Sequence, residues 1–89
     1  MKYLLLYDYI EDVVERRAPL REGHLGMAKR YLEEGTLLMA GALNDPIDGA
    51  VLVFKDREAA EAFAAEDPYV LNGLVTSHRV REWNVVVGE

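Results

Sequence analysis

KYLLLYDY, residues 2–9, is the stretch from which the fold of this chain follows. Alternate residues of a strand point to opposite faces of a sheet. One face of this segment therefore carries Leu4 and Leu6, and the other carries Leu5 together with three tyrosines. A strand that is apolar on both faces is covered on both sides, so we expect residues 2–9 to form a central strand.

The rest of the chain alternates between helical and strand patterns. Pro19 is suited to the first turn of a helix, Gly35 ends a helical pattern, and Asp56 is a good N-cap. The expected elements are a short helix or irregular turn over 11–18, a helix from Pro19 to about Glu34, strands over 36–43 and 50–54 joined by a turn-rich loop, a helix over 57–66, one helical turn over 68–72 closed by Gly73, and a more polar edge strand over 75–87.

This β-α-β-β-α-β order predicts an α+β fold, a ferredoxin-like sandwich with two helices on one face of an antiparallel sheet. Residues 1–89 then form a single domain. The opposite face of the sheet is left bare, and 51% of the residues are hydrophobic. We therefore expect a second copy to cover that face, which gives a two-fold homodimer or a higher homo-oligomer.

Composition excludes several functions. The 10 basic and 16 acidic side chains leave a formal charge of -6, which disfavours nucleic-acid binding. The chain has no cysteine, so thiolate nucleophiles and thiolate metal sites are absent. No stretch approaches the roughly 20 apolar residues of a membrane span, and no secretory signal pattern is present. We expect a soluble, cytoplasmic protein without membrane partners.

The helix expected after Pro19 places His24, and with it Arg21, on its apolar side. A histidine in that position is either a core residue with satisfied hydrogen bonds or an acid or base in a site. A guanidinium that points inward requires an anionic partner, from the protein or from a ligand. Arg21 is therefore a candidate for binding a small-molecule ligand.

Asp67 also has two interpretations. Because it precedes Pro68, it can cap the following helical turn through its carboxylate. It can equally orient the imidazole of a histidine and create a general base that works near neutral pH. The tyrosines of the first strand, Tyr7 among them, can line a ligand pocket or belong to the core or the dimer interface.

Other constellations are not supported. Ser77 and His78 are neighbours in a strand, where they point to opposite faces, so they do not form a nucleophile and base. The histidines and carboxylates have no metal-ligand spacing, the loop at 44–49 lacks the alternating ligands of a calcium loop, and no glycine-rich nucleotide motif occurs. We predict no metal and no cofactor.

Three segments together resemble the YCII-related (YciI-like) family: REGHL at 21–25, GTLLMAG at 35–41 and AAEAFAAEDPYV at 59–70. The resemblance spans nearly the whole chain. It implies a ferredoxin-like fold that dimerises into an α+β barrel. It also implies an active site of one histidine and one aspartate, which correspond here to His24 and Asp67.

Two functions agree with these features. In the first, His24 is a general acid or base held by Asp67, while Arg21 or Tyr7 binds a small anionic or phenolic substrate. Without thiol, metal or nucleotide motifs, the reaction would be a proton transfer such as an isomerisation, an elimination or lactone chemistry. In the second, the protein is a non-catalytic dimer that binds a small ligand or supports assembly. An open pocket beside His24 would favour catalysis or binding.

Overall fold

The computed structural model describes residues 1–88. Its elements follow in the order β1 (Lys2–Tyr9), α1 (Val13–Arg16), α2 (Arg21–Glu33), β2 (Leu37–Leu43), β3 (Gly49–Phe54), α3 (Arg57–Glu66), α4 (Pro68–Leu71) and β4 (Val75–Trp83). None of the helices in this part of the chain combines the length and the apolar character needed to cross a bilayer.

The four strands form one antiparallel sheet in the order β2-β3-β1-β4. The two strands that are apolar on both faces, β1 and β3, are central, and the more polar β4 is an edge. Leu5 of β1 lies opposite Leu52 of β3, and both are almost completely buried. The predicted ferredoxin-like α+β fold is confirmed.

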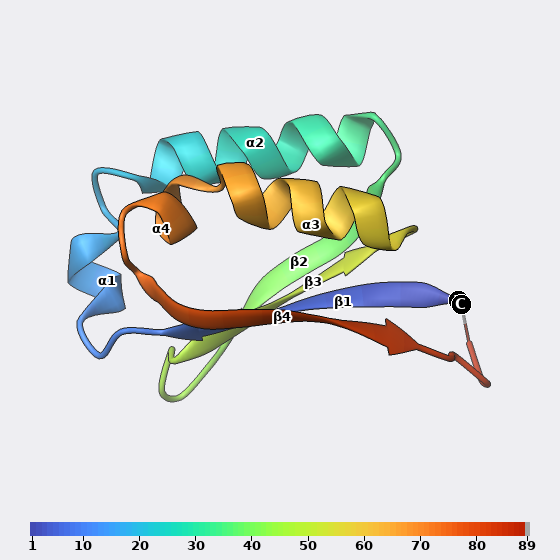
Figure 1. Cartoon of the computed structure of the whole chain (residues 1–89). Coiled ribbons are helices and arrows are strands. Elements are labelled where there is room, and N and C mark those ends of the chain that lie inside the picture. Colours follow the sequence, from blue (N-terminus) through green and yellow to red (C-terminus); the bar gives the residue numbers. More distant parts are fainter. Residues whose placement is uncertain (89) are drawn as a thin grey trace.

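Helices α2, α3 and α4 lie on the same side of the sheet (Figure 1). The main core fills the space between the two layers and contains Phe54 and Phe63, which are fully buried. Asp56 begins α3 as predicted, because its side chain accepts a 2.8 Å hydrogen bond from the backbone N–H of Ala59. The rings of Phe54 on β3 and Phe63 on α3 lie with their centroids 5.7 Å apart, so aromatic packing joins the sheet to the helical layer.

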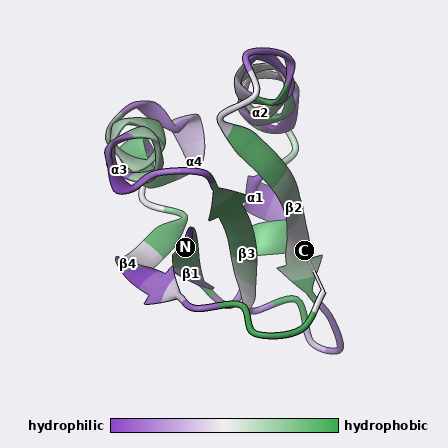
Figure 2. Ribbon diagram, turned by 90° about the vertical axis from the view of Figure 1, so that its right-hand side faces the viewer, coloured by the Kyte–Doolittle hydropathy of each residue, from purple (hydrophilic) through white to green (hydrophobic). Residues whose placement is uncertain are grey.

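The other face of the sheet is covered by no helix among residues 1–88 (Figures 1 and 2). By alternation along β1 and β3, this bare face carries Leu4, Leu6, Val51 and Val53, and Leu4 pairs with Val53 across the two strands. Met39, opposite Val53 on β2, is 65% exposed. An apolar sheet face of this kind is a typical protein interface.

Two predicted boundaries were wrong. The second helix begins at Arg21, because Pro19 lies in a turn that is closed by a 2.8 Å hydrogen bond from Leu20 N–H to the Arg17 carbonyl. The last strand ends at Trp83, well before Val87. Trp83 lies opposite Lys2, the first residue of β1, so no partner strand remains beyond this point.

The second helix was predicted to turn both His24 and Arg21 inward, but only His24 is partly buried, whereas Arg21 is exposed. Met27 is the one buried residue of α2. The helix packs against the edge strand β2, and Met27, Ala28 and Tyr31 are the side chains through which it contacts the main core.

Candidate active site

Asp67 lies at the junction of α3 and α4 and is 0% exposed. Its Oδ1 accepts a 3.0 Å hydrogen bond from the backbone N–H of Tyr69, as a helix cap does. The same atom lies 2.8 Å from Nδ1 of His24, and Oδ2 accepts a 2.7 Å bond from the hydroxyl of Tyr7. The predicted contact between His24 and Asp67 is confirmed, and the carboxylate serves as cap and partner at once.

These bonds fix the tautomer of His24. A carboxylate accepts hydrogen bonds, so Nδ1 of His24 carries the proton that points at Asp67, and the neutral ring keeps its lone pair on Nε2. Nε2 of His24 has no hydrogen-bond partner among residues 1–88. Every buried side-chain nitrogen or oxygen atom in this region does have a hydrogen-bond partner, so Nε2 is not one of the buried atoms. It follows that Nε2 is accessible to solvent although the side chain is only 13% exposed.

The orientation of the imidazole is held by aromatic contacts as well. Its ring stacks on Tyr69 with centroids 3.9 Å apart and planes 6° from parallel, while Phe63 approaches it edge-on at 6.1 Å. Because Tyr69 also supplies the backbone N–H that holds Asp67, one short segment positions both members of the pair. A ring fixed by a carboxylate and by stacking is pre-organised for proton transfer.

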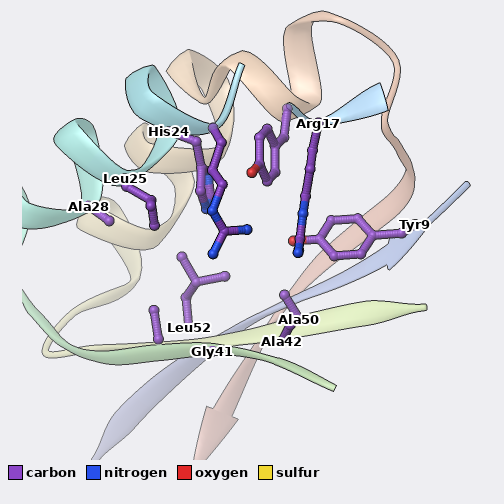
Figure 3. A pocket seen from close by; sticks show the side chains of 12 residues that line it. Tyr9, Arg17, His24, Leu25, Ala28, Gly41, Ala42, Ala50 and Leu52 are labelled. Carbon is purple, nitrogen blue, oxygen red and sulfur yellow. The ribbon is translucent and has the colours of Figure 1, made fainter. Parts of the chain in front are cut away.

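His24 opens onto a pocket of about 230 Å³ between the helical layer and the sheet (Figure 3). This volume suits a molecule built on a single ring, since a cavity of about 150 Å³ already accepts benzene. The polar lining residues are Tyr9, Arg17, Arg21, His24 and Tyr69, and the apolar ones are Leu25, Ala28, Ala40, Gly41, Ala42, Ala50 and Leu52.

The tyrosines around the pair are held in their neutral form. Burial, the charge of Asp67 and the hydrogen bond to it raise the pKa of Tyr7 above its ordinary value. Burial raises the pKa of Tyr9 to about 12, against the opposing effect of Arg17 and Arg21. Burial also raises the pKa of Tyr69. The phenols therefore act as hydrogen-bond donors at neutral pH.

The predicted site residues do not all take the predicted places. His24 and Arg21 line the pocket, and Asp67 lies directly behind His24. Tyr7 does not line the pocket: it is 2% exposed and its hydroxyl is used on Asp67. The expectation that Tyr7 contacts a ligand was therefore wrong, and its neighbour on the same face, Tyr9, takes that position.

Sequence reasoning missed Arg17 and the stacking role of Tyr69. Arg17 falls in the short helix or irregular turn predicted over 11–18, but it was not predicted to reach a site; it lies at the C-cap of α1 and lines the pocket. A signal was present in the sequence. Neither Arg17 nor Arg21 has an acidic residue three or four positions away, in contrast to Arg57, whose guanidinium lies 3.8 Å from Glu61.

No group of three or more metal-ligating side chains converges anywhere in residues 1–88. Ser77 lies opposite Asp8, to which its hydroxyl donates a 2.8 Å hydrogen bond, whereas His78 lies opposite Tyr7. The site therefore offers an imidazole, its carboxylate partner, two guanidinium groups and phenolic hydroxyls.

Fold and site define a ferredoxin-like α+β protein with a His–Asp pair at a small pocket. The chain belongs to the YCII-related family, whose domain model matches residues 1–84. It is 32% identical over 97 residues to Protein YciI of Escherichia coli, covering 97% of this chain and 99% of the relative. An uncharacterised protein of Haemophilus influenzae is 32% identical over 98 residues with the same coverage. The predicted family is thus confirmed.

Solved structures confirm the fold independently. TftG of Burkholderia phenoliruptrix, a 5-chloro-2-hydroxyhydroquinone dehydrochlorinase solved with 2,5-dihydroxybenzoquinone, matches with a TM-score of 0.76 at 17% identity and 94% coverage of both chains. A protein of Agrobacterium tumefaciens matches with a TM-score of 0.55 at 18% identity, covering 91% of this chain and 89% of the other.

Proposed function

We propose that this chain is an enzyme that catalyses proton transfer on a small molecule. His24 is its general acid or base and Asp67 holds the imidazole in the required tautomer. The observation that carries the proposal is the 2.8 Å contact between Nδ1 of His24 and Oδ1 of Asp67, which leaves Nε2 facing solvent at a ring-sized pocket. Such a base contributes about 10²- to 10⁴-fold to a rate.

The reaction is an isomerisation, an elimination or a step on a lactone, because the available groups move protons and bind anions. TftG, which shares the fold, is named for a dehydrochlorination. Loss of HCl from a chlorinated hydroquinone breaks two O–H bonds and one C–Cl bond and forms one C–H bond at the ring. One proton thus moves to carbon and the other is released with chloride, so the conversion to the quinone is redox-neutral overall. A base such as His24 can accept that proton through Nε2.

Two probes test the proposal. 5-Chloro-2-hydroxyhydroquinone reports elimination through chloride release, and α-angelica lactone reports isomerisation through the shift of its double bond. We expect turnover of at least one probe and a fall of about 10²- to 10⁴-fold in His24→Asn. Ala42→Leu, which fills the floor of the pocket without touching the pair, is expected to lose turnover while the protein stays folded.

An alternative function predicts a different outcome. If the protein is a non-catalytic binding dimer, a ring-sized ligand will bind in the pocket while neither probe is converted. Turnover that is equal in the parent and in His24→Asn would contradict the catalytic role of the histidine. The pocket itself, which is open to solvent beside His24, agrees with binding as well as with catalysis.

We further propose that two copies associate through the bare face. Its side chains Leu4, Leu6 and Val51 are partly exposed and Met39 is exposed beside the buried Val53, while the helices of residues 1–88 cover the opposite face. A second sheet would bury this surface and close a barrel. The pocket lies on the helical side, so each copy would keep its own site.

A further inference from the structure

Two arginines enter the pocket without an acidic partner. Arg17 comes from the end of α1 and Arg21 is the first residue of α2, so the turn between the two helices brings both to one cavity. Among residues 1–88, the ion pairs are those of His24 with Asp67 and of Arg57 with Glu61. Neither pocket arginine takes part in them. Arg17 is half-buried and Arg21, which is hydrogen-bonded to Tyr69, is exposed at the edge of the pocket, so both keep a positive charge that no carboxylate of this region pairs with.

The surroundings of these arginines suit a planar anion. Figure 3 shows Arg17 and Tyr9 extending into the cavity, with Gly41, Ala42 and Ala50 along its floor. Arg17 and Arg21 both act on the phenols of Tyr9 and Tyr69 by lowering their pKa values against the effect of burial. Both guanidinium groups are thus close to the hydroxyls. Guanidinium forks bind planar oxyanions such as carboxylates in a bidentate manner.

We infer that Arg17 and Arg21 form an anion subsite that binds the delocalised oxyanion of a single-ring molecule, a carboxylate or an ionised phenol or enol, and holds its ring beside Nε2 of His24. The floor of small residues leaves room for a flat ring, and the volume of about 230 Å³ limits its size. That the ligand is a substrate rests on the proposed function; that it is an anion rests on the two arginines.

The test compares anionic and neutral probes of similar shape. Benzoate represents the carboxylate, 2,5-dihydroxybenzoquinone represents the ionised enol, and benzamide is the neutral counterpart of benzoate. Binding is followed by NMR titration of the ¹⁵N-labelled protein at low salt, with shifts expected for the backbone of residues around the pocket. We expect benzoate or 2,5-dihydroxybenzoquinone to bind at least about tenfold more tightly than benzamide, and to weaken as salt is added.

Four variants locate the subsite. Arg17→Gln and Arg21→Gln should each weaken binding of the anion about tenfold and leave benzamide unchanged. Arg17→Lys keeps the positive charge but removes the planar guanidinium, so it should weaken binding of the anion less than Arg17→Gln does. Arg30→Gln removes the same charge from α2 outside the pocket and should change the affinity less than twofold.

The outcomes separate this inference from the proposed function. His24→Asn should lower turnover about 10²- to 10⁴-fold but still bind the anion. A protein that binds benzoate or 2,5-dihydroxybenzoquinone yet converts no substrate therefore supports the anion subsite and contradicts only the proposed catalysis. The subsite is overturned if neither anion binds up to about 10 mM, if benzamide binds as well as benzoate, or if Arg30→Gln weakens binding as much as Arg17→Gln.

Discussion

The hydroxyl of Tyr7 donates a 2.7 Å hydrogen bond to Oδ2 of Asp67, a residue 60 positions further along the chain. Tyr7 belongs to the central strand β1 and Asp67 to the junction of α3 and α4. This hydrogen bond therefore connects the middle of the sheet to the carboxylate that holds His24. Asp67 is fully buried and accepts bonds on both oxygens. Tyr7 is therefore a positioning residue, not a ligand contact.

Replacing Tyr7 with phenylalanine should lower both stability and turnover. The variant leaves Oδ2 of Asp67 buried without its donor, which costs about 1–3 kcal/mol in the free energy of unfolding. Tyr3→Phe is the matched control, since Tyr3 points to the same face of β1 and its hydroxyl makes no hydrogen bond among residues 1–88. Urea unfolding measures the difference. Equal stability of the two variants would show that the bond to Asp67 contributes nothing.

The free energy of unfolding should decrease as the pH rises above 10. Burial and Asp67 raise the pKa of Tyr7, and burial raises the pKa of Tyr9 to about 12, whereas an ordinary tyrosine has a pKa of 10.0. Below pH 10 both states keep these protons. Between pH 10 and 12 the unfolded chain releases them and the folded chain keeps them, so folding loses stability.

Chemical unfolding at a series of alkaline pH values measures this decrease, and the absorbance of tyrosinate follows the phenols directly. Tyr7→Phe and Tyr9→Phe should each make the decrease less steep, because each removes one proton from the difference between the two states. Stability that stays level up to pH 12, or phenols that all titrate as free tyrosine does, would contradict the buried network.

Light scattering after size exclusion should give about twice the chain mass of 10.1 kDa. Met39→Glu combined with Leu43→Glu puts charges on exposed positions of β2, where Met39 belongs to the bare face, and should shift the particle toward the monomer. Leu71→Glu is the control, because Leu71 is 67% exposed on α4, on the helical side. A parent protein that runs as a monomer at micromolar concentration would contradict the proposed interface.

The fold could be predicted because its central strands have no polar face. The pattern of residues 2–9 and 50–54 leaves only central positions for these two strands, and the register pairs Leu5 with Leu52 accordingly. The boundaries could not be predicted as well. Where the last strand ends depends on where its neighbour begins, and Trp83 is the last residue with a partner on β1.

Part of the candidate site could also be predicted from the sequence. His24 and Asp67 were found through the helical pattern and the family resemblance, and their contact is present at 2.8 Å. The direction of Tyr7 and Tyr9 along one face was also evident, but which of them reaches the pocket depends on how far α2 and α4 cover the strand. The place of Arg17 depends on a turn after α1 that the polar stretch does not reveal.

Two glycine substitutions should have opposite effects on stability. A Cβ at Gly49 would lie 2.5 Å from the carbonyl oxygen of Tyr7 on the neighbouring strand, so Gly49→Ala must displace the β1–β3 pairing next to the site. At Gly26, in the middle of α2, nothing lies within 4 Å of the added carbon. Gly26→Ala should therefore raise the free energy of unfolding by about 0.5–1 kcal/mol. Thermal melts compare the two; a stabilised Gly49→Ala would show that the strands accommodate the methyl group.

His24→Asn and Asp67→Asn should separate a functional pair from a structural one. His24→Asn removes the base, but Asp67 keeps the donors Tyr69 N–H and Tyr7 hydroxyl, so we expect turnover to be lost while Tm falls by less than about 8 °C. Asp67→Asn places an amide at a fully buried position that accepts three hydrogen bonds, and its Tm should fall further.

Asp56→Asn supplies the reference for Asp67→Asn. Asp56 is also an N-cap, but it is exposed and its carboxylate accepts only the N–H of Ala59, so the same substitution there should cost a few tenths of a kcal/mol at most. Differential scanning calorimetry and the turnover assay are run on the same preparations. If His24→Asn destabilises the protein as strongly as Asp67→Asn does and turnover per folded molecule is unchanged, the histidine serves the fold and the catalytic proposal is wrong.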